Sequence, residues 1–238
     1  MAAVCACGEY FNVDDTGELC LNPGTMGLRK VVQFGTPGTY KFRKADYPWL
    51  ARVRVKVQAG GGGSAGADAE AKQLIARPGA SRGGYSESVI EVGALADVES
   101  VVGEGGSGGD GNNPGSAGGA SSFGGTVTAA GGNPGTDGMT SGTSNTTSNG
   151  VVAPNAGSGQ VTSGGGPGQG SLRMGVRGMA GMGGDSWLGF GGYGRTTSGS
   201  GSAPRGRGGG AGGALSADGK RYTGASGGTG IVIIELLG

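Results

Sequence analysis

The clearest element in the sequence is an alternation of hydrophobic and charged residues between Leu50 and Gln58. Three valines fall on one face of this segment and three basic residues fall on the other: Val53, Val55 and Val57 against Arg52, Arg54 and Lys56. This period of two, with β-branched residues on one side, predicts a half-buried β-strand. The glycine run at 60–63 ends the strand abruptly.

Other segments carry weaker strand signals. Further strands are expected at 28–34, 39–42, 85–92 and 98–102, with a turn at 36–38. The apolar run from Ile231 to Leu236 is typical of a strand that is buried on both faces or at a subunit interface. One short window, at 66–76, has a helix-like pattern, and no helix of ordinary length is expected.

Glycine divides the chain into unequal parts. Of the 62 glycines, six lie in residues 1–59, 55 lie in residues 60–230, and the last is Gly238. Ordering a residue costs about 1–2 kcal/mol, glycine is at the expensive end, and apolar side chains are too sparse here to offset that cost. The body is therefore either disordered or ordered through backbone contacts. In the second case, extended threefold helices pack side by side and exchange N–H···O bonds.

The strand and glycine patterns predict a mainly β and irregular fold with almost no α-helix, and a body of packed polyglycine-II-like helices is the ordered one of the two alternatives. Composition places the glycine-rich body at 60–230 and the closing β-strand at 231–238. The family resemblance described below divides the residues before the body into an N-terminal segment at 1–35 and a β-strand region leading into the body at 36–59. Asn-Pro-Gly turns at 113–115 and 133–135 predict short segments folded back on themselves, and no fixed repeat period is present.

Charge and hydropathy argue against several classes of partner. The formal net charge is +1 and 15% of the residues are charged, so no overall field favours nucleic acid or an anionic membrane. No apolar run approaches the length of a membrane span, and residues 1–21 lack the basic and apolar segments of a secretory signal. We therefore expect neither nucleic-acid binding nor membrane insertion.

The residue types needed for catalysis are scarce. Because there is no histidine, a Ser-His-Asp triad is excluded, and the aspartates at 110, 137, 185 and 218 lie in predicted turns, where they bond nearby backbone. Residues 103–108 resemble a nucleotide-binding glycine loop but lack the following helix and a Gly-Lys-Ser/Thr sequence. Arg205-Gly-Arg207 resembles one fragment of an RNA-binding RGG segment, for which a solvated turn is the simpler interpretation. We expect no enzyme and no cofactor.

Three cysteines lie near the start of the chain, at Cys5, Cys7 and Cys20. Their spacing is not a usual zinc pattern, and no histidine supplies a fourth ligand, so we assign no metal site. Two alternatives remain open: the cysteines are free or buried thiols, or they bind a metal or form a disulfide. We regard the three as candidate assembly thiols, since a trimer would bring the cysteines of several copies together.

Large side chains are scattered singly through the glycine-rich body. Trp187, Phe190 and Tyr193 form a cluster spaced by glycine, and Phe123 and Tyr222 stand apart from it. Such rings serve as sugar-stacking platforms or interface anchors, or they pack against the glycine helices. These five residues are therefore candidate receptor or interface contacts. The methionines at 174, 179 and 182 are expected to fill gaps in an interface.

Several short motifs follow one another in an order typical of one protein family. They are R-V-R-V-K-V-Q at 52–58, the glycine run at 60–63, G-G-Y-S-E at 83–87, V-V-G at 101–103 with glycine pairs at 105–106 and 108–109, A-S-S-F-G at 120–124, and G-T-G-I-V-I-I-E at 228–235. Over residues 36–238 the chain resembles glycine-rich tail proteins of bacteriophages. It is most similar to minor tail proteins or receptor-binding tail adhesins of phages that infect actinobacteria.

The resemblance implies a β-sheet scaffold built from the first and last strands, and a sandwich of polyglycine helices whose distal loops contact the bacterial surface. It implies a virion tail component at the tail tip or in a fibre, assembled in the host cytoplasm together with other tail proteins. We expect a homotrimer and, where the role is adhesive, contact with a host cell-surface glycan. Residues 1–35 depart from the family pattern and are interpreted as a virion-attachment segment.

Two questions stay open at this level. The role is either structural or adhesive, and the motifs do not separate the two. The alternative to a tail protein is a disordered glycine-rich linker or an RNA-binding, phase-separating protein, which the same composition also fits.

Overall fold

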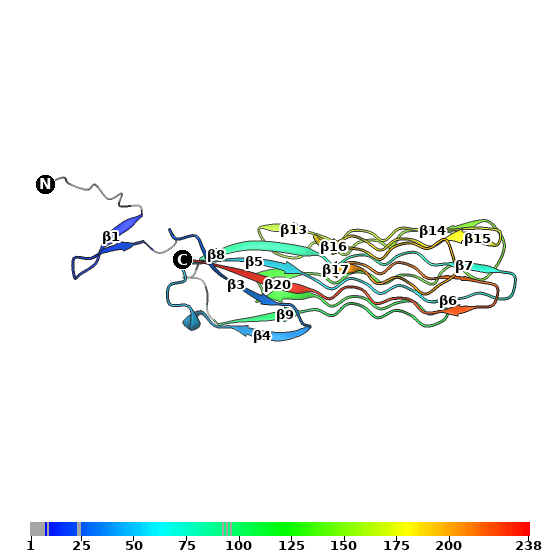
Figure 1. Ribbon diagram of the computed structural model, residues 1–238, viewed down its shortest axis with the longest axis horizontal. Coiled ribbons are helices and arrows are strands. Elements are labelled where there is room, and N and C mark those ends of the chain that lie inside the picture. Colours follow the sequence, from blue (N-terminus) through cyan, green and yellow to red (C-terminus); the bar gives the residue numbers. More distant parts are fainter. Residues whose placement is uncertain (1–7, 9, 23–24, 92, 94, 96) are drawn as a thin grey trace.

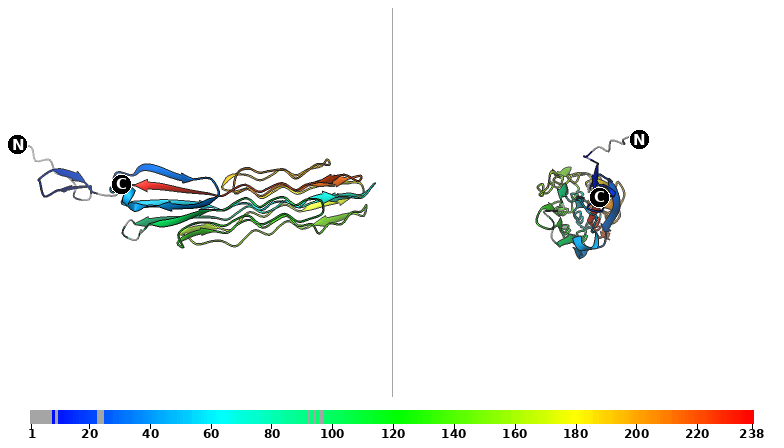
Figure 2. Two further views of the ribbon diagram at one scale, coloured as in Figure 1. Left: turned by 90° about the horizontal axis from the view of Figure 1, so that it is seen from below. Right: turned by 90° about the vertical axis from the view of Figure 1, so that its left-hand side faces the viewer.

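The protein is a rod, and three parts follow one another along its long axis (Figure 1). The computed structural model describes residues 8, 10–22, 25–91, 93, 95 and 97–238. A small hairpin lies at one end, two β-sheets follow, and a bundle of extended segments reaches the other end. The C-terminus lies beside the sheets, and the end-on view in Figure 2 shows how narrow the rod is. We call the hairpin end proximal and the opposite end distal.

Two antiparallel sheets form the proximal β-sandwich. The first has the strand order β13-β8-β5-β20-β3 and the second the order β11-β10-β9-β4. Their strands are β3 (Leu28–Phe34), β4 (Gly38–Phe42), β5 (Arg52–Gln58), β8 (Tyr85–Glu91), β9 (Val98–Val102), β10 (Ser121–Phe123), β11 (Val127–Ala129), β13 (Val161–Ser163) and β20 (Ile231–Leu237). The 3₁₀ turn η1 (Lys44–Asp46) follows β4, and the separate hairpin pairs β1 (Phe11–Val13) with β2 (Leu19–Leu21).

Alternate residues from both sheets make up the core of the sandwich. The three valines of β5 are fully buried there, which confirms the half-buried strand expected at this position. They pack in one cluster with residues of β20 and of the second sheet: Val232, Ile234, Leu236, Phe42, Val102, Phe123 and Val127. Burying each such side chain contributes roughly 1.5–3 kcal/mol, so this core is the main apolar support of the fold.

The closing strand, β20, lies inside the first sheet. It pairs with β5 along one edge and with β3 along the other. Ile234 points into the core, whereas Glu235 lies on the partly covered outer face. Because β3 falls within residues 1–35, the sheet takes strands from both sides of the boundary that the family resemblance placed after residue 35.

Ion pairs cross the outer face of the first sheet and join β8, β5 and β20. Arg54 of β5 pairs with Glu87 of β8, and its guanidinium also lies 3.9 Å from the carboxylate of Glu235 on β20. Lys56 pairs with Glu235, and the hydroxyl of Tyr85 donates to Glu87 at 2.7 Å. We call these five residues the charge ladder. Two basic residues predicted on the outer face of β5 are thus paired with acids of the neighbouring strands.

Backbone hydrogen bonds in the glycine-rich body have a period of three. In segment 60–66, every third amide donates to the same neighbouring segment: amides 60, 63 and 66 to the carbonyls of 119, 116 and 113, amides 61 and 64 to those of 228 and 225, and amide 62 to that of 81. These N···O distances are between 2.9 and 3.1 Å. Carbonyls of the same segment accept bonds from three further segments, at amides 132 and 135, 106 and 109, and 211.

Segment 77–84 repeats this pattern. Its amides 77, 80 and 83 donate to carbonyls 214, 211 and 208, amides 79 and 82 to carbonyls 169 and 166, and amides 81 and 84 to carbonyls 133 and 130. Pro78 interrupts the series because it has no N–H, while its ring favours the backbone angle of a threefold extended helix. The body is therefore ordered through backbone contacts between polyglycine-II-like helices, as the composition allowed.

Glycine is required at the centre of the body because the backbones of different segments touch. A Cβ atom built on Gly60, Gly61, Gly62 or Gly63 would lie 2.0–2.1 Å from a carbonyl oxygen of another segment. No side chain fits at that distance. The buried stretches 59–67, 74–81 and 208–216 form the centre of the bundle, and the other segments surround them.

Short strand pairs close the turns at the distal end. β6 (Ala67–Asp68) pairs with β19 (Arg221–Tyr222), β7 (Leu74–Ala76) pairs with β18 (Leu215–Ala217), and β14 (Ser171–Met174) lies between β12 (Thr146–Ser148) and β15 (Arg177–Met179). The helix-like pattern at 66–76 does not form a helix. Its apolar residues belong to β6, β7 and the turn between them, because Ala67 and Ile75 are buried in a small distal core.

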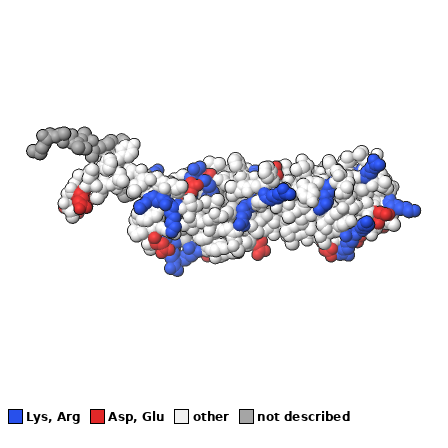
Figure 3. Space-filling model, in the orientation of Figure 1, with Lys and Arg blue, Asp and Glu red and all other residues white. Residues whose placement is uncertain are grey.

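Charged side chains of both signs are dispersed over the face shown in Figure 3, and most of that face is uncharged. This distribution agrees with the formal net charge of +1. Within the described ranges, no helix has the length and apolar character that crossing a bilayer requires.

Candidate functional site

Three of the five predicted contact residues gather on the side of the rod. Trp187, Phe190 and Tyr193 are 61%, 71% and 53% exposed, and Leu188 and Met182 are exposed beside them. We call these five residues the aromatic flank. They lie on or next to the antiparallel pair β16 (Leu188–Phe190) and β17 (Arg205–Arg207). A group of exposed apolar side chains of this kind indicates an interaction site.

Glycine positions the aromatic flank. Gly189 faces Gly206 across the β16–β17 pair, and a Cβ on Gly189 would lie 2.5 Å from the Cα of Gly206. Only glycines fit between the two backbones. Because successive side chains of a strand point to opposite faces, Leu188 and Phe190 point outward together.

The rings of the flank have few partners inside the chain. Trp187 lies against Tyr85 with ring centroids 5.4 Å apart. The guanidinium of Arg195 lies 5.2 Å from the ring centroid of Tyr193 and donates to its hydroxyl at 3.1 Å. Phe190 remains the most exposed of the three rings.

A hollow of about 440 Å³ lies between Phe190 and Tyr193, and Asp185 and Arg205 also line it. The carboxylate of Asp185 accepts a hydrogen bond from the amide of Gly191 at 2.7 Å, which fixes its position. Two aromatic rings offer apolar faces for stacking, while a carboxylate accepts and a guanidinium donates hydrogen bonds. This combination suits a ligand with both apolar faces and hydroxyl groups.

The remaining two predicted contacts lie elsewhere. Phe123 is 1% exposed and sits in the core of the sandwich, where its ring lies 5.7 Å from that of Phe42. The short strand β10 turns this side chain inward, so it offers no surface to a partner. Tyr222 is half-buried at the distal end, where it packs on the cluster that contains Ala67 and Ile75.

Of the candidate assembly thiols, Cys5 and Cys7 lie outside the described residues. Cys20 is a free, half-buried thiol on β2 and donates to the carboxylate of Asp14 at 3.7 Å. Burial raises the pKa of the Cys20 thiol, and the nearby negative charge of Asp14 adds to the increase. Among the described residues, no three Cys, Asp or Glu side chains gather closely enough to hold a metal ion.

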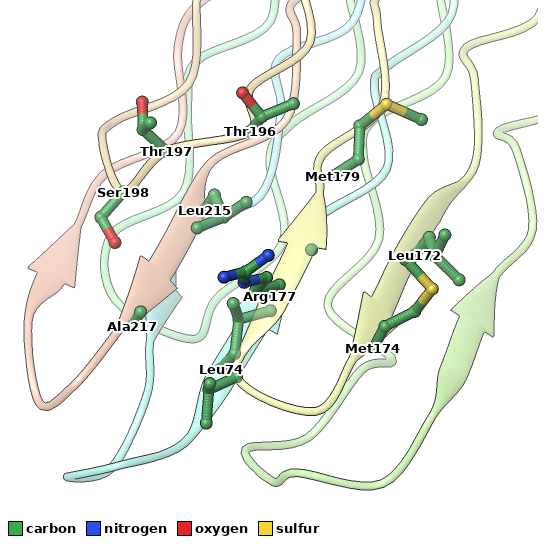
Figure 4. A pocket seen from close by; sticks show the side chains of 12 residues that line it. Leu74, Leu172, Met174, Arg177, Met179, Thr196, Thr197, Ser198, Leu215 and Ala217 are labelled. Carbon is green, nitrogen blue, oxygen red and sulfur yellow. The ribbon is translucent and has the colours of Figure 1, made fainter.

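Sequence reasoning missed a second surface, at the distal end of the rod. A pocket of about 620 Å³ opens there beside the hairpin β14–β15, and Figure 4 shows the side chains that line it. We call it the distal pocket; its principal residues are Leu74, Leu172, Met174, Arg177, Met179 and Leu215. A signal for the hairpin exists in the sequence, because Gly175-Val176 separates two short segments and glycine is favoured at the first position of a two-residue hairpin turn. In the structure Gly175 has the positive φ, +62°, that such a turn requires.

Comparison with known proteins bears on the chain from the second sheet to the closing strand. A search of curated proteins finds no significant match. A family model described as a glycine-rich domain matches residues 36–237, which include the second sheet, β5, β20 and the entire glycine-rich body. The protein therefore belongs to the glycine-rich domain family.

Proposed function

We propose that this protein is a component of a bacteriophage tail, located at the tail tip or in a fibre. Its role is mechanical and adhesive and involves no catalysis. The order of motifs along residues 36–238, which resembles that of phage tail proteins, supports this proposal. The family match supports the glycine-rich domain within it and leaves the place on a virion to experiment.

The observation that carries the proposal is the separation of two ends along the rod. The β1–β2 hairpin and the C-terminus lie at the proximal end, and the turns of the glycine-rich body lie at the distal end (Figure 1). A tail component needs one end for assembly and another surface for the host. A rod with this polarity supplies both.

The glycine-rich body suits a load-bearing spacer. Its central segments form backbone hydrogen bonds to neighbours on all sides, and their carbonyls and amides are buried. Such a network leaves little backbone for a protease to bind and gives a stiff unit. The same network counts against the alternative of a disordered linker or RNA-binding segment, which needs a solvated backbone.

Assembly is proposed to use the proximal end. The hairpin β1–β2 has three-residue strands and exposes Val13, Leu19 and Leu21. An isolated two-stranded hairpin is marginally stable in water, so a partner would have to cover it. We propose that other tail proteins do so in a homotrimeric assembly formed in the host cytoplasm and carried in the virion.

The adhesive part of the proposal rests on the aromatic flank. Phe190 and Tyr193 of the flank, together with Asp185 and Arg205, provide stacking faces and hydrogen-bonding groups in one hollow. Trp187 is a further exposed ring of the flank outside this hollow. Sugars need both, because their rings have an apolar face and a rim of hydroxyls. A host cell-surface glycan is therefore the proposed ligand of the aromatic flank.

Two measurements test this function. Mass spectrometry of purified virions should detect the chain; its absence would overturn the tail assignment. Purified protein should bind intact host cells, and binding should weaken on cells stripped of surface glycans. The double variant Trp187→Ala/Phe190→Ala should lose this binding, whereas Val152→Ala, which truncates an exposed valine outside the flank, should keep it. Presence in virions without cell binding would leave a purely structural role.

A further inference from the structure

The side chains of strand β14, at the distal end, are arranged against the usual pattern. Its inward residues are polar, since Ser171 and Arg173 are buried, and its outward residues are apolar, since Leu172 is partly exposed and Met174 is exposed. A strand on the surface of a soluble protein normally turns its apolar side chains inward. β14 therefore presents an apolar surface that the fold itself does not need.

The buried polar residues hold this arrangement in place. Arg173 donates to the carbonyl oxygens of Ser144 and Leu74 at 2.8 and 2.9 Å, and to that of Thr140 at 2.6 Å. The hydroxyl of Ser171 donates to the carbonyl of Ala76 at 2.7 Å. Turning the strand over would break these four bonds and leave the buried carbonyls of Leu74 and Ala76 without a donor, which is unfavourable.

The outward residues form one wall of the distal pocket. Leu172 faces Met179 across the β14–β15 pair, and the buried side chains of Leu74 and Leu215 lie beneath (Figure 4). The volume of about 620 Å³ is typical of pockets that bind small molecules. The pocket is therefore large enough to take an apolar chain rather than a single methyl group.

The polar side chains that line the distal pocket can all donate hydrogen bonds. Arg177 points into the space between β15 and β18, and the loop 196–198 adds three hydroxyl side chains (Figure 4). No Asp or Glu lines the pocket, and within the described part of the chain no acid pairs with Arg177. An unpaired cation beside an apolar groove is complementary to a ligand with an apolar chain and a negative head.

We propose that the distal pocket binds the acyl chain of an anionic lipid at the surface of the host envelope. The chain lies against Leu172, Met179 and Leu215, and the anionic head lies at Arg177 and the hydroxyls of 196–198. The chemistry of the pocket stands on its own, whereas the source of the lipid rests on the proposed tail function.

Calorimetric titration of the purified full-length protein tests the chemistry. Three amphiphiles with the same eight-carbon chain serve as probes below their micelle-forming concentrations: octyl phosphate, octyl glucoside and octyltrimethylammonium. We expect saturable binding of octyl phosphate at one site, roughly tenfold tighter than binding of octyltrimethylammonium, because only the anion gains a charge-assisted bond to Arg177. Non-saturable binding, or equal affinity for the anion and the cation, would overturn the proposal.

Exposed positions allow variants that leave the fold intact. Arg177→Glu should reverse the preference between octyl phosphate and octyltrimethylammonium. Met179→Asp should weaken the binding of octyl phosphate and of octyl glucoside alike. Met179→Leu, which keeps an apolar side chain, should bind both probes as the unmodified protein does. Val152→Asp places the same charge on an exposed valine outside the pocket and should change nothing. If Arg177→Glu and Met179→Asp bind octyl phosphate as the unmodified protein does, the pocket is not the site.

Vesicles test the source of the lipid. The protein should sediment with phosphatidylglycerol vesicles, and not with phosphatidylcholine vesicles, in a manner that Met179→Asp abolishes. Binding of octyl phosphate without binding of these vesicles would overturn the membrane lipid as the ligand. Virion analysis separates the two proposals. A chain that is present in virions but binds no amphiphile would overturn the lipid site and keep the tail function. A chain that binds octyl phosphate but is absent from virions would keep the site and overturn the tail function.

Discussion

At the scale of single residues, the glycines at the centre of the body are fixed by contact distance. Most glycines in proteins are chosen for their backbone angles, but Gly60–Gly63 have no unusual φ value. They are needed because the space where a Cβ atom would lie is already filled by a carbonyl oxygen of another segment. A methyl group there would separate two hydrogen-bonded backbones.

Replacing one of these glycines should therefore destabilise the body. In Gly62→Ala, the new Cβ atom would lie 2.1 Å from the oxygen of Asn133, so we expect a loss of about 1–3 kcal/mol or more. Gly138→Ala is the matched control, because nothing lies within 4 Å of its Cβ position. Thermal unfolding followed by calorimetry would measure both. Equal midpoints for the two variants would contradict close backbone packing at residue 62.

A buried arginine holds the distal turns together. Arg77 is almost fully buried and donates to the carbonyls of Gly66 and Met139 at 2.7 and 2.8 Å and to the side-chain oxygen of Asn112 at 2.8 Å. Burial lowers the pKa of Arg77 to about 10, with the charge of Asp137 acting in the opposite direction, so the guanidinium stays charged at neutral pH.

Arg77→Met should leave these acceptors buried and unpaired, and we expect a loss of about 2–5 kcal/mol. Arg221→Met is the control, because its partner Asp110 is exposed and ion pairs at the surface contribute little to stability. Chemical denaturation would compare the two. A loss at Arg77 no larger than that at Arg221 would show that the buried bonds add little.

At the scale of elements, the charge ladder links three strands and makes their association depend on pH. Burial acts to raise the pKa of the Glu87 carboxyl, but hydrogen bonds from Tyr85 and Arg54 and the charge of Arg54 outweigh it and hold the pKa below its usual value of 4.5. A carboxyl whose pKa is lower in the folded state stabilises the fold above the unfolded pKa. That contribution is lost as the pH falls through the folded value.

We therefore expect the melting temperature to fall as the pH drops below about 4.5, with Glu87 contributing to the loss. Glu87→Gln should be less stable than the unmodified protein at pH 7 and should lose less stability in acid. Glu104→Gln alters an exposed glutamate outside the ladder and should follow the unmodified curve. Parallel curves for all three proteins would exclude a role for Glu87 in the acid response.

At the scale of the whole molecule, the rod combines two kinds of core. The proximal sandwich is held by apolar side chains, and the glycine-rich body is held by hydrogen bonds between backbones. These two cores meet where β5 and β20 continue directly into segments 59–67 and 223–230. The rod therefore has no flexible joint at this junction, which suits the transmission of force between its ends.

Hydrogen exchange should reveal the backbone core directly. We expect the slowest-exchanging amides of the body in the buried stretches 59–67, 74–81 and 208–216. Among the described residues, the fastest exchange is expected in the β1–β2 hairpin, whose two strands pair with each other and with no further strand of the described chain. Mass spectrometry of exchange on the purified chain would measure this order. Exchange of residues 60–66 within seconds would contradict a packed body.

Much of this architecture could be predicted from local patterns. The period of two at 52–58 and the apolar run at 231–236 identified the strands that lead into and out of the body. The excess of glycine restricted the body to disorder or backbone packing. The pattern at 66–76 misled because it is too short to distinguish a helix from two strands around a turn.

Side-chain direction could not be predicted in the same way. In a segment with one large residue among glycines, no periodicity shows which side of the backbone faces inward. Phe123 and Phe190 look alike in sequence, yet Phe123 lies in the core and Phe190 is the most exposed ring of the flank. The distal pocket was missed for the same reason, because β14 buries Arg173 and exposes Met174.

The sequence by itself determined the class of fold, the framing strands and the need for glycine, because each depends on composition or on short-range periodicity. Tertiary structure alone decided which segments neighbour one another, which rings face the solvent and where the pockets open. The physical reason is that a threefold extended helix forms no hydrogen bonds within itself. All of its partners come from other segments, and only the folded chain selects them.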